Sequence, residues 1–528
     1  MIHLDIESSA TNNNGPKMHH IMSLPHEIIE EILGNLDYRC LVRCSSACKS
    51  MRKTIVNSSQ LTYIIELGMD GMIENGPSNT LSYAELLSKL RERRRAWSTL
   101  SWKTVTTVPM RGLCHAYELV GGMFVKAIGG HDFLATWLPS TTSESRQLHR
   151  DDLKIRARDF AIDPGQDLII FIEEDGGPYS DVDGRFVRLY IRTISTHDAH
   201  PDAHLQILPF FIPPHTVYGT FVRSIMLQVA DDIVAVLIST GFQRLLLWNW
   251  KAGILLSDSA KEGYGLPEGT WDFSFISSRA YILTSLDFDG YLQINTFESE
   301  EGYQHTHIAS LALPELEDNI TVRKLSTHSG PFETPLRDKP FTTSPDSRLH
   351  VVDIQYSSDH HRGSQTHYRL FVHNRTFLSY VEAYKNMTAT GNSWIPWSFW
   401  GPASSRLVVG DSSFSWLRYV HGQRVVCSQT PESSPKILEV LDFNVRPSHL
   451  PPSGFDLGAA RKIIDGPSVV PPNDIFQREV TTYLPYSSTS RVIFVHYSAF
   501  MIDEERIIGL KAEGHADEEL KELHVYAF

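Results

Sequence analysis

The chain has 528 residues, with 62 acidic and 48 basic side chains and a formal net charge of −14. A single hydrophobic core stops growing near roughly 250 to 300 residues, so this length predicts two or more folded units unless one of them is a repeat. The negative charge argues against a general binder of nucleic acid or anionic membranes, so we expect neither among the partners.

The N-terminus and the cysteines indicate a compartment. Residues 1–22 lack the basic and apolar regions of a signal peptide, and their polar composition predicts a disordered leader. No apolar run approaches the length of a membrane-spanning helix. The five cysteines are an odd number with three crowded into one segment, which fits reduced thiols better than a disulfide framework. We therefore expect a cytoplasmic and/or nuclear protein.

Residues 23–65 predict a small helical unit. Apolar residues recur at the i, i+4 spacing of a helix face from about Pro25 to Leu36, with Ser23 as a plausible N-cap. Asp37 is a plausible N-cap of a second helix. The apolar residues that follow it, up to about Ile55, predict either one helix or two helices separated by a break. Helices this short are marginal in water, so such an apolar unit implies a docking surface.

The same residues resemble the F-box family. The Leu24-Pro25 start, the first helix with acidic and apolar residues, the Leu36-Asp37 turn and the later Cys48-Lys49 carry the resemblance, which departs where Met51 replaces the usual aromatic. The resemblance implies docking on a Skp-type adaptor and through it on a cullin-RING ubiquitin ligase. The residues implied for this contact, some of which must pack inward, are Leu24, Pro25, Ile28, Ile29, Ile32, Leu33, Leu36, Leu41, Cys44, Cys48 and Met51.

Residues 66–104 predict a linker region with one amphipathic helix, from Leu81 to Leu100. We interpret its interleaved arginines as a solvated helix face; a patch for nucleic acid or an acidic partner is the alternative. Together with Trp97 and Trp102, this segment looks like the helix that leads into a β-rich domain in fungal F-box proteins.

Residues 105–528 predict a large all-β domain, so that the whole chain is of the α+β class. Apolar, β-branched and aromatic runs alternate with turn dipeptides such as Gly121-Gly122 and Asp289-Gly290, the pattern of antiparallel hairpins. Similar strands recur at Leu189, Leu247, Leu292, Leu370, Leu417 and Leu523, several of them at the ~40 to 50 residue period of a propeller blade. We predict a β-propeller of six to eight blades, with a pair of β-sandwiches as the alternative.

Ring closure and long loops give two further expectations. The run from Leu523 to Phe528 would have to pair with β-structure near Met110 to Phe124, so that no strand edge stays open. The stretches from Thr327 to Pro345 and from Pro447 to Pro472 predict long loops between blades.

Possible metal ligands occur in three places: Cys40, Cys44 and Cys48; His197, His200 and His204; and the acidic turns at Asp183 and Asp289. The cysteines lack a fourth convergent ligand, and the histidines lie in a polar loop without a rigid element to preorganise them. The acidic turns lack the carboxylates that a calcium loop needs at its first and twelfth positions. We predict no metal site.

Catalytic and cofactor motifs are also missing from the sequence. It holds no Gly-x-Ser-x-Gly elbow and no Gly-rich phosphate loop, so we predict no catalytic residue and no cofactor. A propeller-fold hydrolase is a less favoured alternative, which would need convergent polar groups with shifted pKa values in the channel.

The tryptophans Trp394, Trp397 and Trp400 crowd into one short segment. Exposed aromatic residues are the usual anchors of a binding surface, so these are candidate target-binding residues. The alternative is that they fill the wedge between adjacent blades. The sequence as a whole therefore predicts the substrate-recognition subunit of a Skp/cullin/F-box type ubiquitin ligase, with an interaction scaffold outside ubiquitination as the alternative.

Overall fold

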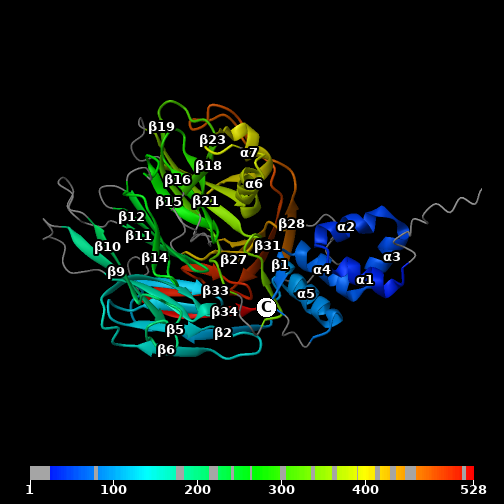
Figure 1. Ribbon diagram of the computed structural model, residues 1–528, viewed down its shortest axis with the longest axis horizontal. Helices are drawn as coiled ribbons and strands as arrows, with labels where there is room; N and C mark the ends of the chain where they lie inside the picture. Colours follow the sequence, from blue (N-terminus) through cyan, green and yellow to red (C-terminus); the bar gives the residue numbers. More distant parts are fainter. Residues whose placement is uncertain are drawn as a thin grey trace, which may run out of the picture. The chain divides into compact units, whose positions relative to one another are not determined.

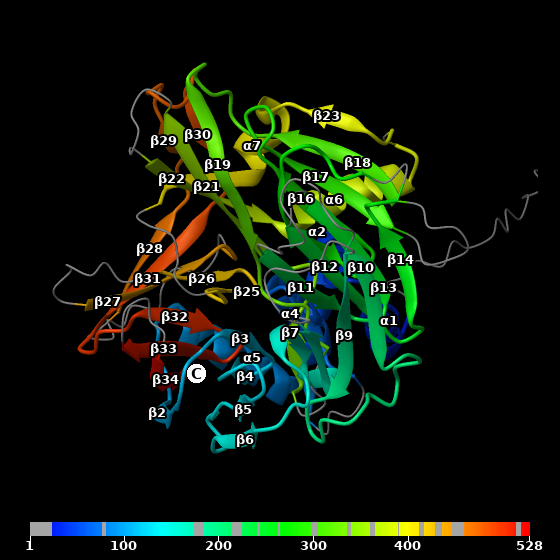
Figure 2. The same cartoon turned by 90° about the vertical axis from the view of Figure 1, so that its left-hand side faces the viewer.

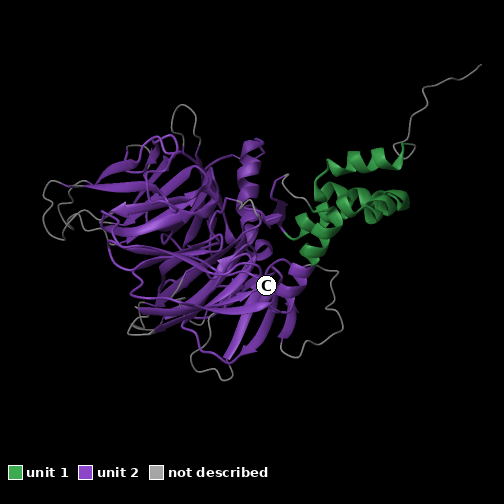
Figure 3. Cartoon of the chain, turned by 90° about the horizontal axis from the view of Figure 1, so that it is seen from below, with its two compact units in different colours: residues 1–70, 79–91 green, residues 71–78, 92–528 purple. Residues whose placement is uncertain are grey.

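The computed structural model describes residues 24–76, 81–173, 184–212, 224–239, 243–261, 265–297, 305–334, 339–358, 365–388, 390–410, 417–427, 436–445, 459–513 and 519–528. The predicted leader and the predicted cap Ser23 lie outside these residues. The chain divides into two compact units (Figure 3). Unit 1 comprises residues 1–70 and 79–91, and unit 2 comprises residues 71–78 and 92–528.

Unit 1 begins with four short helices (Figure 1): α1 (His26–Gly34), α2 (Tyr38–Ala47), α3 (Lys49–Asn57) and α4 (Ser59–Met69). Asp37 is the N-cap of α2, as predicted, because its carboxylate accepts from the backbone N–H groups of Arg39 at 2.8 Å and Cys40 at 3.0 Å. The second predicted helix is a broken pair. Extended backbone at Cys48 separates α2 from α3, and the Cys48 Sγ accepts from the N–H of Met51 at 3.4 Å.

The core of unit 1 is built from the inward faces of α1 to α4: Ile29, Leu33, Leu41, Met51, Ile55 and Leu61. Met51 stands where the F-box pattern has an aromatic residue, and its side chain is buried in this core. Met51 therefore contributes to the packing within unit 1.

Helix α5 (Tyr83–Ser98) falls within the predicted amphipathic segment and contributes residues to both units. It starts with a capping box, in which the backbone N–H of Ser82 donates to the Glu85 carboxylate at 2.8 Å. At its other end, within unit 2, Trp97 stacks on Phe528 with ring centroids 4.0 Å apart. The predicted lead-in tryptophan is thus part of the core of the β unit.

The described strands of unit 2 form a seven-bladed β-propeller, with the blades following one another around a centre (Figure 2). Blade 1 contains β3 (Ala116–Val120), β4 (Met123–Ala127), β5 (Phe133–Trp137) and β6 (Arg146–Arg150). Blade 2 contains β7 (Ala157–Asp163), β8 (Leu168–Glu173), β9 (Arg185–Thr193) and β10 (Ile207–Ile212). Blade 3 contains β11 (Ser224–Ala230), β12 (Ile233–Ser239), β13 (Gln243–Asn249) and β14 (Ile254–Asp258).

Blade 4 contains β15 (Thr270–Ser277), β16 (Ala280–Ser285), β17 (Tyr291–Phe297) and β18 (His305–Ala312). Blade 5 contains β19 (Ile320–His328), β21 (Leu349–Ser358), β22 (Gln365–His373) and β24 (Ser405–Val409). Blade 6 contains β25 (Val420–His421), β26 (Arg424–Val426), β27 (Lys436–Asp442) and β31 (Tyr486–Ile493), with β28 (Ala459–Ile464) at the edge. Blade 7 contains β32 (Ala499–Ile502), β33 (Arg506–Glu513), β34 (Glu519–Ala527) and, from the start of the unit, β2 (Thr104–Pro109).

Blade 7 closes the ring by pairing strands from opposite ends of unit 2. Strand β2 runs antiparallel to β34, with Val108 opposite Leu523. We predicted that the run from Leu523 to Phe528 pairs near Met110 to Phe124, but it pairs with β2 instead. Of the predicted range, Met110 and Leu113 contact only the start of β34: the N–H of Met110 donates to the carbonyl of Lys521 at 2.7 Å, and Leu113 forms a bridge with Glu519. Residues 116–124 belong to blade 1, because the turn at Gly121-Gly122, with both φ angles positive, folds β3 onto β4.

The second strand of a blade is covered on both faces, which explains the continuous apolar runs of the sequence. Strand β12 is buried over almost its whole length. Five of the six leucines used to mark the repeat lie on third strands, but Leu417 precedes the first strand of blade 6. The long interval between Leu292 and Leu370 contains an insertion within blade 5.

This insertion joins β19 to β21 and spreads over several blades. Thr334 donates its hydroxyl to Asp163 of blade 2 at 2.6 Å, and the Lys339 Nζ lies 3.5 Å from the Glu505 carboxylate of blade 7. Within it, β20 (Phe341–Thr343) pairs with β1 (Met72–Glu74). The predicted loop between blades at 327–345 therefore lies inside blade 5 and reaches residues of blades 2 and 7.

Three smaller additions complete unit 2. The short helix η2 (Pro164–Gln166) joins β7 to β8. Helices α6 (Asn374–Lys385) and α7 (Trp397–Ser404) flank β23 (Ser393–Ile395), which extends blade 4 by pairing parallel with β18. Of the second predicted loop, at 447–472, the described part contains β28 and β29 (Ser468–Val470), which pairs with β30 (Val480–Thr482).

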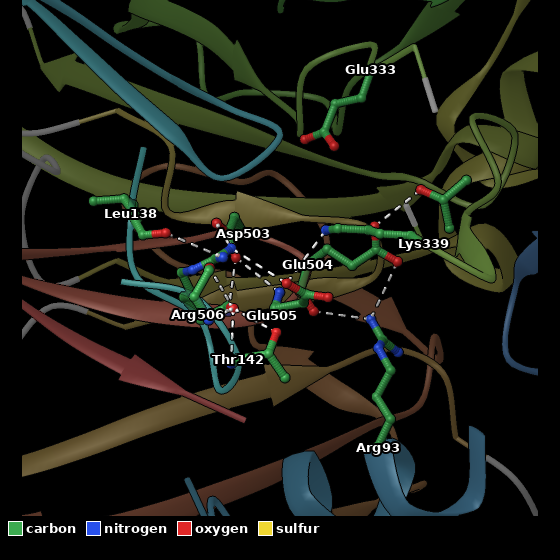
Figure 4. Close-up of polar contacts among 12 residues, drawn as sticks. Arg93, Leu138, Thr142, Glu333, Lys339, Asp503, Glu504, Glu505 and Arg506 are labelled. Carbon is green, nitrogen blue, oxygen red and sulfur yellow. Dashed lines mark hydrogen bonds and ion pairs between the residues drawn. The ribbon is translucent and has the colours of Figure 1, made fainter. Parts of the chain in front are cut away.

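The turn between β32 and β33 carries a buried charged cluster (Figure 4). The Arg506 guanidinium donates to the Asp503 carboxylate at 3.1 Å and to the carbonyl of Pro139 in blade 1 at 2.7 Å. Burial alone raises the pKa of Asp503, but the cations Arg506 and Lys339 outweigh it and hold that pKa below its usual range. The cluster therefore links blades 7 and 1 through a paired ion.

Glu333 of the insertion lies beside this cluster and is expected to make stability pH-dependent. Burial, reinforced by the Glu504 carboxylate, raises the pKa of Glu333 from 4.5 to about 8. Burial also lowers the pKa of His421, which lies 3.7 Å from it, to about 3, so both groups are neutral at pH 7. Because Glu333 releases its proton more easily in the unfolded chain, stability is full below the unfolded pKa and falls as pH rises toward 8.

Replacement of Glu333 by glutamine should remove this fall. Between pH 5 and pH 8 the parent should lose on the order of 2 to 4 kcal/mol more free energy of unfolding than Glu333→Gln, as measured by urea unfolding. The exposed residue Glu268 supplies the control variant Glu268→Gln. If the free energy of unfolding changes equally with pH in the parent and in Glu333→Gln, the expectation is wrong.

Candidate functional site

Helix α1 has two apolar faces with different environments. Ile29 and Leu33, one turn apart, are 3% and 2% exposed and pack into the core of unit 1. Ile28 and Ile32, also one turn apart, are 42% and 41% exposed, and Leu24 before the helix is 40% exposed. An i, i+4 pair of large apolar residues on the outer face of a short helix is a ready surface for a partner.

The structure divides the predicted adaptor-binding residues between these two environments. Leu24, Pro25, Ile28, Ile32 and Cys48 are exposed. The inward group consists of Ile29, Leu33, Leu41 and Met51, which are buried, and Leu36 and Cys44, which are half-buried. The outward group, which we call the docking face, is therefore available to a partner, while the inward group holds α1 to α4 together.

The possible metal ligands that the structure describes do not form a metal site, and Asp183 lies outside the described residues. Within the described ranges, no group of three or more His, Cys, Asp or Glu residues could hold a metal ion. Cys40, Cys44 and Cys48 are free thiols. His200 lies 2.9 Å from the carbonyl of Gln166 through its Nε2, and His204 is exposed.

The three predicted target-binding tryptophans occupy different environments. Trp400 is buried, and its indole N–H donates to the carbonyl of Ala312 at 2.8 Å. Trp397 is half-buried and packs edge-on against Trp400 at 5.2 Å. Trp394 is 49% exposed and lies against the exposed ring of Phe288 at 5.8 Å. Of the three, Trp394 offers the most aromatic surface to a target.

The propeller channel contains a cavity of about 390 Å³, within the size range of small-ligand pockets. Its wall comes from the first strands of blades 1 to 5, from residues 417, 418 and 420, and from residues 329–332 of the insertion. Three carboxylates line it: Glu118, Asp159 and Asp272. Sequence reasoning missed these residues, because they lie on different blades and form no local motif.

Burial in the channel shifts the ionisable groups. It raises the pKa of Asp159 to about 6 and that of Asp272 to about 7, and lowers the pKa of His328 to about 4. Polar groups with shifted pKa values thus line one cavity, which is the feature that a propeller-fold hydrolase would need. Among the described lining residues, however, no serine hydroxyl is hydrogen-bonded to His328, so a Ser–His nucleophile pair is not assembled there.

Comparison with protein families identifies the helical module. The F-box domain model matches residues 21–61, which span α1 to α3 and the start of α4. The chain thus carries an F-box domain followed by a seven-bladed β-propeller. F-box domains typically bind Skp-type adaptors and are generally not catalytic.

Other comparisons find remote likenesses. No curated protein matches the sequence. Among solved structures, the computationally designed Ika8 protein is 10% identical, with 80% of this chain and 98% of that chain covered and a TM-score of 0.30. The N-terminal domain of Nup159 is 9% identical over 79% and 91% of the two chains with a TM-score of 0.31. Chaetomium thermophilum Sqt1, bound to the N-terminus of the ribosomal protein L10, is 12% identical over 50% and 59% with a TM-score of 0.27.

None of the described helices combines the length and the apolar character that a membrane crossing would require.

Proposed function

We propose that this protein is the substrate-recognition subunit of a Skp/cullin/F-box type ubiquitin ligase. Its F-box would dock on a Skp-type adaptor, and its propeller would hold a target protein. The observation that carries the proposal is the docking face, where Ile28 and Ile32 stay exposed although the opposite face of α1 is packed into the core.

The energetics favour docking through this face. Each large apolar side chain that moves from water into an interface contributes roughly 1.5 to 3 kcal/mol. Three such residues at one end of unit 1, Leu24, Ile28 and Ile32, therefore provide enough free energy to anchor a specific complex.

The propeller would contribute by proximity. Holding a target on the same chain as the adaptor-binding module raises the effective concentration of its lysines near the ubiquitin-conjugating enzyme. The exposed aromatic pair Trp394 and Phe288 is one candidate surface for the target. The chain itself performs no bond chemistry in this scheme.

The double variant Ile28→Asp with Ile32→Asp tests the docking face. Loss of both apolar contacts and burial of two carboxylates should weaken adaptor binding by at least 100-fold, on the order of 3 kcal/mol or more. Binding is measured by titration calorimetry of the full chain with a Skp-type adaptor. The matched control is Ile463→Asp, an isoleucine of the propeller with a similar exposure of 40%, which should bind like the parent.

The result separates the alternatives. If the double variant binds the adaptor as tightly as the parent does, the docking face is not the contact and the proposal fails. If the parent binds the adaptor but the complex does not recruit a cullin, the chain is an interaction scaffold outside ubiquitination.

A further inference from the structure

The cations that line the channel cavity are all engaged by the protein. The Arg418 guanidinium forms two hydrogen bonds with the Glu118 carboxylate, one of them at 2.5 Å. Lys324 lies 3.4 Å from the carboxylate of Asp353. Arg348 donates to the backbone carbonyls of Pro345, Gly330 and Phe275 at 2.9, 3.0 and 2.7 Å. None of the three is left to bind an anion.

Two of the carboxylates, in contrast, have no cationic partner. Asp272 and Asp159 form no ion pair with any residue of the described ranges. The Asp272 carboxylate accepts from the backbone N–H groups of Phe273 and Thr327, at 2.7 and 2.8 Å, which occupies both of its oxygens. Asp159 accepts only from the adjacent Phe160 N–H, at 2.8 Å through Oδ1, and keeps part of its surface accessible.

A second polar group in the wall also has no partner. The Oγ1 of Thr327, a residue that is 7% exposed, forms no hydrogen bond within the part of the chain that the structure describes. A buried hydroxyl without a partner costs about 1 to 3 kcal/mol. The cavity wall thus contains a carboxylate without an ion-pair partner and a buried hydroxyl without a hydrogen bond.

We propose that this cavity binds an alkylguanidinium or alkylammonium group, with Asp159 as its counter-ion. The apolar part of the wall, which includes Val120, Ile162 and Phe332, would accept the alkyl stem. The group comes either from an arginine or lysine side chain of a target protein or from a free small amine. The former source rests on the receptor role proposed above, while the pocket itself does not.

The chemistry of the site favours a cation over other ligands. A cation near Asp159 would gain an ion pair in a low-dielectric cavity, where such a pair is stronger than in water. An anion would meet the same carboxylate without a free cation to offset the repulsion. A neutral apolar group would leave the Asp159 carboxylate in the cavity without an ion-pair partner.

The test uses a blocked pentapeptide with arginine at its centre, the same peptide with citrulline, which is a neutral isostere, and n-butylguanidinium. Titration of the full chain should show at least tenfold tighter binding of the arginine peptide than of the citrulline peptide. Tighter binding of the peptide than of n-butylguanidinium assigns the group to a target side chain, and the reverse assigns it to a small amine.

Two variants connect binding to the cavity. Asp159→Asn, which keeps the side-chain shape, should lose at least tenfold in affinity for the arginine peptide, while the exposed control Asp202→Asn should not. Ile225→Trp, which adds bulk to the half-buried wall, should also weaken binding. Equal affinity for the arginine and citrulline peptides, or unchanged binding by Asp159→Asn, would overturn the proposal.

Adaptor binding by the same variants keeps the two proposals separate. Asp159→Asn should bind the adaptor like the parent, and the double variant at Ile28 and Ile32 should bind the arginine peptide like the parent. Loss of one activity without the other therefore shows which proposal has failed.

Discussion

Replacement of Arg506 by methionine is expected to lower the free energy of unfolding by about 3 to 5 kcal/mol. The guanidinium is the partner of the buried Asp503 carboxylate and also donates to the carbonyl of Pro139 in blade 1. Methionine fills a similar volume but leaves a carboxylate and a carbonyl without these donors. Urea unfolding followed by tryptophan fluorescence measures the loss.

An exposed ion pair of the same type provides the control. Arg478 lies 3.5 Å from Glu315, with side chains 81% and 56% exposed. Because water screens this pair, Arg478→Met should change stability by no more than about 0.5 kcal/mol. Similar losses in the two variants would show that the buried cluster does not stabilise the junction of blades 7 and 1.

Replacement of Val108 by aspartate should destabilise the ring by about 4 kcal/mol or more. Val108 lies on β2, opposite Leu523 of β34, and its side chain is buried in the cluster shared by blades 1 and 7. A carboxylate there has no partner and weakens the pairing that closes the ring. Limited proteolysis should also cut the propeller faster, because open ring edges expose backbone.

The neighbouring residue Thr107 gives the matched control. It lies on the same strand, opposite His524, but its side chain is exposed. Thr107→Asp should therefore fold and resist proteolysis like the parent. If Val108→Asp does the same, the closing strand contributes little to the stability of unit 2.

Local features were predicted well from the sequence. The cap at Asp37 and the i, i+4 spacing on α1 depend on contacts within one or two turns, so short-range rules recover them. The strands of the blades were predicted because a strand covered on both faces needs a continuous apolar run. The spacing of Leu247 and Leu292 then revealed the repeat.

Features that depend on distant residues were not predicted correctly or were missed. The closing strand was placed too late in the chain, because register between β2 and β34 is set by packing in blade 7 rather than by local pattern. The insertion before β21 was read as a loop between blades, since its partners Asp163 and Glu505 lie far away in sequence. The cavity carboxylates share no motif for the same reason.

The pairing of β2 with β34 also has a consequence for biosynthesis. Unit 1 is made mostly of contiguous residues with local contacts, which form quickly. Strand β2, in contrast, must wait for its partner β34, which lies more than 400 residues later in the sequence, to leave the ribosome. During that interval the F-box helices are already folded, while the incomplete ring exposes unpaired strand edges. We therefore expect the nascent protein to depend on chaperones until β34 is made.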